Sequence, residues 1–96
     1  MAESEIKREV EGSKGRYVLT IDGHEADLTY SIASPTLVIA DHTGVPDALR
    51  GTGAGRRLVE RLVADAKAEG FKIMPLCPFV NAQRKRHPEW AEHFAV

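Results

Sequence analysis

Apolar and polar residues alternate with a period of two through the first part of the chain, as is typical of strands with one buried face. Residues 5–11 carry two apolar positions among charges, which predicts a weak edge strand. Residues 16–21 and 25–32 alternate cleanly, and the Asp-Gly pair between them is a hairpin-turn sequence. Residues 36–40 are continuously apolar, which favours a strand buried on both faces. The pattern predicts three antiparallel strands leading into a fourth.

The second half of the chain changes to a helical period. Residues 41–50 contain Gly and Pro breakers and are predicted to form a loop. Residues 53–69 place their apolar positions on one stripe, which predicts an amphipathic crossover helix. A fifth strand over 71–76 would then pair parallel to the fourth, and a short last helix is expected over 80–86. The predicted fold class is α+β, and Trp90 and Phe94 are expected to pack back onto the core.

Size, charge and cysteine content narrow the class of protein. A chain of 96 residues predicts a single domain over 1–96, with residues 1–4 and the last few loose. A net charge of −1 gives no basic field for nucleic acid, and no apolar run approaches the roughly 20 residues of a membrane span. The single cysteine excludes an internal disulfide and suits the reducing cytoplasm, and no Cys/His spacing indicates a metal site.

Residues 50–55 read RGTGAG, directly before the predicted helix. The first N–H groups of a helix have no partners and lie at its positive dipole end, so they bind anions, and glycines let a phosphate approach closely. The dinucleotide pattern G-x-G-x-x-G fails because Arg56 or Leu58 takes the third glycine position. The Walker pattern fails because no Gly-Lys-Ser/Thr follows. A glycine-rich helix start without any ligand is the structural alternative.

The spacing of Arg50, Gly53 and Gly55 fits Arg/Gln-x-x-Gly-x-Gly and resembles the pyrophosphate loop of GCN5-related N-acetyltransferases. The stretches VPDALRGTGAGRRLVERLVADAKAEG, IMPLCPFV and RHPEW are similar to the small members of that family. The resemblance covers nearly the whole chain. It implies the minimal form of that fold, with strands one to four antiparallel, a crossover helix, a parallel fifth strand and a short last helix.

The resemblance also implies acetyl-CoA as cosubstrate, with no metal. Backbone N–H groups of 51–56 would hold the pyrophosphate, Arg50 with Arg56 or Arg57 would add charge, and the backbone of 42–45 would pair with the pantetheine arm. The last helix would contribute two further contacts. The residues expected to bind CoA are Val45, Arg50, Gly51, Thr52, Gly53, Ala54, Gly55, Arg56, Asn81 and Arg84.

Acetyl transfer needs a neutral amine, a polarised thioester carbonyl and a proton for the leaving thiolate. Many larger acetyltransferases use a tyrosine on the last helix as that acid, and no tyrosine follows the fifth strand here. Cys77 stands there instead. The hypothesis is that Cys77 takes the acetyl group transiently or lies near the thioester, with His42 across the cleft as base. The alternative is that Cys77 is a small buried apolar residue and His42 belongs to a solvated loop.

The resemblance predicts an N-acetyltransferase with an unidentified amine acceptor. Larger relatives build the acceptor pocket from N-terminal helices that are missing here, so the site would be open and suited to an exposed amine on a large partner such as a protein. A CoA-binding module with weak or no catalysis, and a generic anion-binding interaction domain, are the alternatives. The sequence leaves the oligomeric state open.

Overall fold

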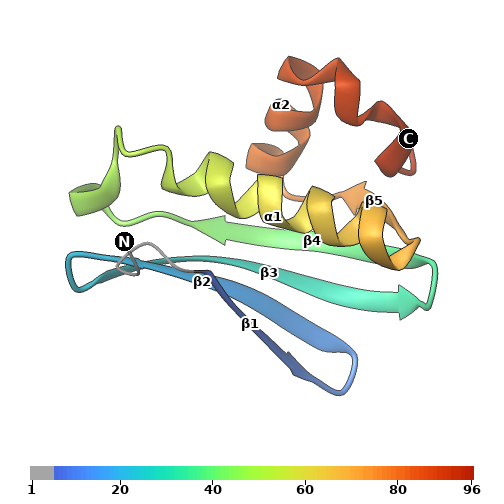
Figure 1. Ribbon diagram of the computed structural model, residues 1–96, viewed down its shortest axis with the longest axis horizontal. Helices are drawn as coiled ribbons and strands as arrows, with labels where there is room; N and C mark the ends of the chain where they lie inside the picture. The colour runs from blue at the N-terminus through green and yellow to red at the C-terminus, as the bar shows by residue number, and fades with distance from the viewer. Residues whose placement is uncertain (1–5) are drawn as a thin grey trace.

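The computed structural model describes residues 6–96 and contains a single five-stranded sheet (Figure 1). Its strands are β1 (Ile6–Glu11), β2 (Lys14–Ile21), β3 (His24–Ser34), β4 (Leu37–Gly44) and β5 (Lys72–Pro75), which lie in that order across the sheet. Among the first four strands each is antiparallel to its neighbour, and β5 runs parallel to β4. The predicted α+β class and strand topology are confirmed. The expectation for residues 1–4 lies outside the described residues.

Helix α1 (Ala54–Glu69) crosses from β4 to β5, and α2 (Pro78–Arg86) follows β5. The α1 helix ends at Gly70, whose φ of 81° is the left-handed conformation that glycine adopts at helix ends. Two short 3₁₀ helices were not predicted, η2 (Asp47–Leu49) and η3 (Pro88–His93). Each is too short for a hydrophobic period to reveal it.

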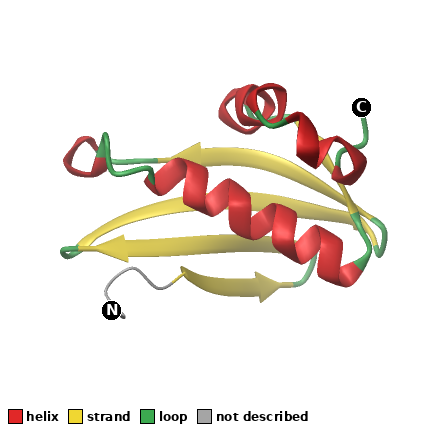
Figure 2. Ribbon diagram, turned by 45° about the horizontal axis from the view of Figure 1, so that its top comes forward, coloured by secondary structure: helices red, strands yellow, loops and turns green. Residues whose placement is uncertain are grey.

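The core lies between one face of the sheet and α1, with α2 packed beside it (Figure 2). Phe94 is buried, Trp90 packs partly buried against the core, and the N–H of Ala95 donates to the Ile73 carbonyl at 2.8 Å. The chain end is therefore held along β5, as expected for Trp90 and Phe94. The residues that are fully shielded and largest are Tyr17, Tyr30, Leu19, Leu28, Leu58, Leu62, Ile73, Val59 and Val80.

Strand β4 is longer than the apolar run predicted. Its pairing with β3 continues past a bulge, because Thr29 pairs with His42 whereas Tyr30 pairs with Ala40, leaving Asp41 as the extra residue. The polar sequence after Ala40 was predicted to be a loop, and this boundary was wrong. Backbone pairing to β3 extends the strand, which ends at Gly44. The extension carries β4 beyond the last residue that pairs with β5.

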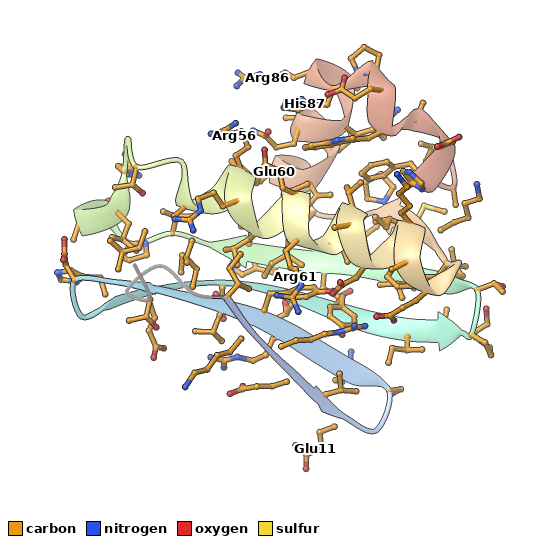
Figure 3. The ribbon with its side chains drawn as sticks, viewed as in Figure 1. Glu11, Arg56, Glu60, Arg61, Arg86 and His87 are labelled. Carbon is orange, nitrogen blue, oxygen red and sulfur yellow. The ribbon has the colours of Figure 1, made fainter. Side chains whose placement is uncertain are left out.

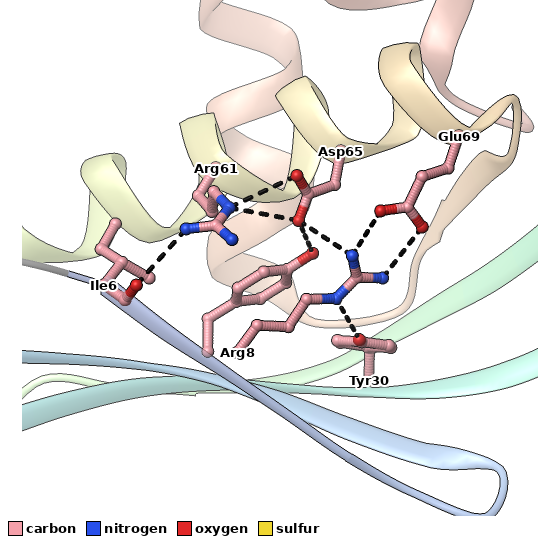
Figure 4. A network of polar contacts seen from close by, with 7 residues as sticks. Ile6, Arg8, Tyr30, Arg61, Asp65 and Glu69 are labelled. Atoms are coloured by element: carbon pink, nitrogen blue, oxygen red, sulfur yellow. Dashed lines mark hydrogen bonds and ion pairs between the residues drawn. The ribbon is translucent and has the colours of Figure 1, made fainter.

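A polar network ties the edge strand β1 to the second half of α1 (Figure 4). The Arg8 guanidinium donates to Glu69 and, through Nε, to the Tyr30 hydroxyl at 3.0 Å. Asp65 accepts from the Tyr17 hydroxyl at 2.7 Å and from Arg61 at 3.2 Å, and its Oδ2 lies 3.3 Å from Arg8. The network fixes α1 on the sheet and thereby positions the first turn of that helix.

Candidate functional site

The turn before α1 is shaped by two glycines with left-handed backbone. Gly51 has a φ of 83° and Gly53 a φ of 80°, values that residues with a side chain rarely adopt. Between them, the Thr52 hydroxyl donates to the Leu49 carbonyl at 2.6 Å and accepts from the Ala54 N–H at 3.2 Å. The Thr52 side chain therefore stabilises the turn by hydrogen-bonding to a carbonyl and to an N–H group within it.

The first turn of α1 presents free donors. Its first backbone hydrogen bond runs from the Arg57 N–H to the Gly53 carbonyl at 3.0 Å. Within residues 6–96, no backbone bond engages the N–H groups of Gly53, Gly55 or Arg56. Three donors at the positive end of a 16-residue helix make this turn suited to an anion.

A cavity of about 440 Å³ opens in front of this turn. Gly55 keeps it narrow but open, since a Cβ there would lie 2.7 Å from the Phe79 ring. Seven of the ten predicted CoA-binding residues line the cavity; Thr52, Asn81 and Arg84 do not. The lining residues are Val45, Leu49, Arg50, Gly51, Gly53, Ala54, Gly55, Arg56, Phe79, Gln83 and Arg86.

The two α2 residues expected to contact CoA, Asn81 and Arg84, lie outside the lining of this cavity. Arg84 turns back onto its own helix and donates to the Asn81 amide oxygen at 2.8 and 3.0 Å. The cavity is instead lined by Phe79, Gln83 and Arg86, which are spaced i, i+4 and i+7 and so share one face of the helix. That spacing was visible in the sequence, but only the packing against Gly55 shows which face meets α1.

The cationic groups around the cavity differ in how far they are already paired. Arg50 lies 3.1 Å from Asp47 and Arg56 lies 3.4 Å from Glu60, both in exposed pairs of the kind that contribute little to stability. No ion pair within the described chain involves Arg86. Figure 3 shows Arg56 and Arg86 extending toward the same side of the molecule.

Val45, in the lining of this cavity, directly follows the end of β4, the strand that separates from β5. Their pairing ends at Ala40 and Pro75, and the Cys77 N–H then donates to the Ala40 carbonyl at 2.9 Å. In the part of the chain that the structure describes, no strand pairs with residues 41–44 on the β5 side. The cleft therefore offers an extended ligand a free strand edge, with Val45 joining it to the cavity.

The structure does not bring the two predicted catalytic residues together. Cys77 is 3% exposed, and its thiol donates to the Thr43 hydroxyl at 3.5 Å. His42 is exposed and pairs across the sheet with Thr29, whereas Thr43 pairs with Leu28 on the core face. Cys77 thus lies on the α1 side of β4 and His42 on the opposite side.

A second and larger cavity, of about 710 Å³, lies on the sheet and is lined by strand residues alone. It reaches β4 at Asp41, whose carboxylate accepts from the Ser31 hydroxyl at 2.6 Å, and Lys14 donates to the same hydroxyl at 2.8 Å. Arg16 lies 3.3 Å from Glu9 across the cavity wall. Its lining consists of Glu9, Val10, Glu11, Lys14, Gly15, Arg16, Thr29, Tyr30 and Asp41.

Two other kinds of site were sought among the described residues. Residues 6–96 contain no group of three or more His, Cys, Asp or Glu side chains placed to hold a metal ion. Within the same range, neither α1 nor α2 is long and apolar enough to cross a membrane.

Comparisons with known proteins agree with the fold. A model of the GCN5-related N-acetyltransferase family matches residues 16–93. The NMR solution structure of a GCN5-like candidate N-acetyltransferase from Staphylococcus aureus superposes with a TM-score of 0.73 at 27% identity, over 98% of this chain and 90% of that one. No curated protein matched the chain. Because the family model spans most of the sequence, this chain belongs to the GCN5-related N-acetyltransferase family.

Proposed function

We propose that this protein binds acetyl-CoA in the cleft at the start of α1 and transfers the acetyl group to an amine. The observation that carries the proposal is the continuity of two features. The residues with free N–H groups, Gly53, Gly55 and Arg56, line a cavity, and Val45 in the same lining directly follows the end of β4 that does not pair with β5. Family membership supports acetyl transfer as the reaction.

The residues present fit CoA. The diphosphate would accept from the N–H groups of the first turn of α1, where Gly53 and Gly55 carry no side chain of their own. Arg50 and Arg56 would add charge at the rim. The pantetheine arm, which carries amide groups, would pair with the backbone of residues 42–45. This arrangement brings the thioester, the activated acyl donor, to the side of Cys77.

Cys77 has two roles open to it at that position. In the covalent route, its thiolate attacks the acetyl carbonyl, the bond from that carbon to the CoA sulfur breaks, and CoA leaves as a thiol after taking a proton. The acceptor amine then displaces Cys77 from the acetyl group and loses a proton. In the direct route, the amine attacks acetyl-CoA itself and Cys77 only packs against Thr43. The full burial of Cys77 favours the direct route, because an attacking thiolate needs access.

His42 suits a role on the acceptor side of the sheet. It is exposed and pairs with Thr29, which lines the larger cavity. We propose that this open face admits the acceptor, since its lining has three carboxylates against the two cations Lys14 and Arg16, a small net negative charge that favours a protonated amine. His42 would then take the proton that the amine must lose before attack. An open face lined by strands would accommodate an amine on a large partner.

One observation favours the alternative of a CoA-binding module with weak or no catalysis. The only tyrosines are Tyr17 and Tyr30, and both are buried in the core, so neither can protonate a leaving thiolate in the cleft. A generic anion-binding domain is the second alternative, and only ligand preference separates it from the first.

Thermal unfolding with acetyl-CoA, CoA, ATP and inorganic phosphate at matched ionic strength tests the cofactor. A ligand that binds only the folded state stabilises it by RT ln(1 + [L]/Kd), about 2.7 kcal/mol at a hundredfold excess over Kd. We expect both CoA forms to raise the melting temperature and ATP to raise it little. Equal effects of ATP and CoA would leave only the generic anion site.

Turnover on a panel of amines then separates an enzyme from a binding module. Comparison of wild type with Cys77→Ala decides the route, with intact mass measured in the absence of acceptor. Retained turnover and no acetylated protein would establish direct transfer. Lost turnover, together with an acetyl group on wild type but not on the variant, would establish the covalent route.

A further inference from the structure

We propose that Arg86 and Gln83 form a subsite for the outer end of CoA, with Arg86 binding the 3′-phosphate of its ribose. This inference rests on the proposed function. It assigns residues of α2 that the glycine-rich loop motif does not contain. The juxtaposition that carries it is the stripe formed by Phe79, Gln83 and Arg86, which faces the first turn of α1 across the cavity.

The order of groups along α2 matches the order of groups along CoA. The helix begins after Cys77, at the separation of β4 and β5, where the thioester end would lie. Phe79 contacts Gly55, so the diphosphate site lies beside the first turn of α2. Arg86 is the last residue of α2, seven residues after Phe79 and so roughly 10 Å further along the helix at 1.5 Å per residue. The phosphomonoester is also the outermost anion of CoA.

The ion pairing of the arginines around the cavity favours Arg86 as the residue that binds the phosphate. Arg50 and Arg56 each have a carboxylate partner, Asp47 and Glu60. Arg86 lines the cavity without an ion pair anywhere in residues 6–96. A guanidinium that lines a cavity and is unpaired there is suited to bidentate contact with a phosphate, because its donors match phosphate oxygens in geometry.

The amide of Gln83 gives an independent indication of a ligand. Gln83 is only 7% exposed, and its Oε1 is shielded from solvent without a hydrogen-bond partner in the described chain. A buried polar atom without a partner is rare and destabilises the free protein. Gln83 lies one turn inward from Arg86, and the ribose 2′-hydroxyl next to the 3′-phosphate is a donor that would satisfy it.

The test compares CoA with 3′-dephospho-CoA, which lacks only the phosphomonoester. Calorimetric dissociation constants are measured for wild type, Arg86→Gln and Lys85→Gln at one ionic strength. Lys85→Gln is the matched control, because it removes the same charge from an adjacent exposed residue that does not line the cavity. We expect wild type and Lys85→Gln to bind CoA about tenfold more tightly than dephospho-CoA, as a charge-assisted phosphate contact provides. Arg86→Gln should bind the two ligands equally.

Two outcomes overturn the subsite while leaving the proposed function intact. Either Arg86→Gln keeps the preference for CoA, or it weakens both ligands by the same factor. If wild type binds neither ligand, the proposed function fails as well. Melting temperatures without ligand verify that each variant is folded.

Gln83→Leu provides a second readout. It replaces an unpaired amide with an apolar side chain of similar volume. We expect the ligand-free protein to melt at the same temperature or higher, and the affinity for both ligands to fall severalfold. A purely structural glutamine would give lower stability and unchanged affinity, and that result would overturn its assignment.

Discussion

Removing a single hydroxyl from the network beneath α1 tests whether that network determines stability. In Tyr17→Phe the ring contacts remain, including the Tyr30 ring at a centroid distance of 5.4 Å. The variant loses only the hydrogen bond to Asp65, 2.7 Å long and donated to a charged acceptor. Such a bond contributes about 1.5–3 kcal/mol. Asp65 keeps Arg8 and Arg61 as partners, so the loss leaves no unpaired buried charge.

A loss of this size is large for a chain of 96 residues. Small domains unfold with a free energy of only about 5–15 kcal/mol, and each kcal/mol shifts the melting temperature by roughly 4–8 °C. Urea unfolding at pH 7 should therefore show a lower midpoint with an unchanged m-value. A variant within about 0.5 kcal/mol of wild type would refute the reasoning, because it would mean that solvent replaces the bond at no cost.

The same variant makes a signed prediction for pH. Burial raises the pKa of the Tyr17 phenol above its usual range, and its hydrogen bond to Asp65 raises that pKa further. The folded state therefore favours the neutral phenol. The stability this provides is fully present below about pH 10, where tyrosine ionises in the unfolded chain, and is lost as the pH rises toward the folded-state pKa.

The advantage of wild type over Tyr17→Phe should accordingly shrink above pH 10, by at most about 1.4 kcal/mol per pH unit for one proton. Because the two proteins share the other groups that titrate in this range, the contributions of those groups cancel in the difference between the two free energies of unfolding. A difference that stays constant to pH 11 would contradict the assignment of the burial effect to Tyr17.

Three further substitutions test other parts of the account. Gly53→Ala forces a left-handed residue and should cost about 1–2 kcal/mol in urea unfolding; unchanged stability would show that the turn relaxes. Leu62→Ala opens a cavity at a fully buried site and should cost about 2–5 kcal/mol while CoA affinity at low temperature stays within twofold of wild type; a large affinity loss would mean that the core couples to the cleft. Asp41→Asn should raise KM for cationic amines severalfold without changing the Kd of CoA, whereas equal effects on both would remove the acceptor role of the strand-lined cavity.

The sequence predicted the elements whose residues repeat with a clear period. Strands β2 and β3 follow from alternation, β4 from a continuous apolar run and α1 from a stripe of apolar residues, and the parallel β5 follows from the crossover that α1 makes. The Asp22-Gly23 turn follows from local backbone preference, and both residues have the positive φ that such a turn needs. These features depend on neighbours in the chain, which is why one sequence suffices to predict them.

The features that the sequence did not predict depend on contacts between residues that are far apart in the chain. The end of β4 was missed because its polar residues are held by pairing with β3 through a bulge. The face of α2 that lines the cavity was also missed, because Gln83 and Phe79 reach the cavity only through the packing of two helices, whereas Arg84 donates to Asn81 on its own helix. The pairing of Cys77 with His42 was expected from nearness to the same cleft, and the pleat places them on opposite faces of β4.

The most direct test of the central claim is a map of backbone amide shifts during titration of ¹⁵N-labelled protein with CoA. The account predicts saturable shifts at the N–H groups of Gly53, Gly55 and Arg56, together with shifts at residues 42–45 and at Arg86. Inorganic phosphate should move only the first group, and with weaker affinity. Saturable shifts confined to the strand-lined cavity, or no saturable shift with CoA, would contradict the claim that the start of α1 is the cofactor site.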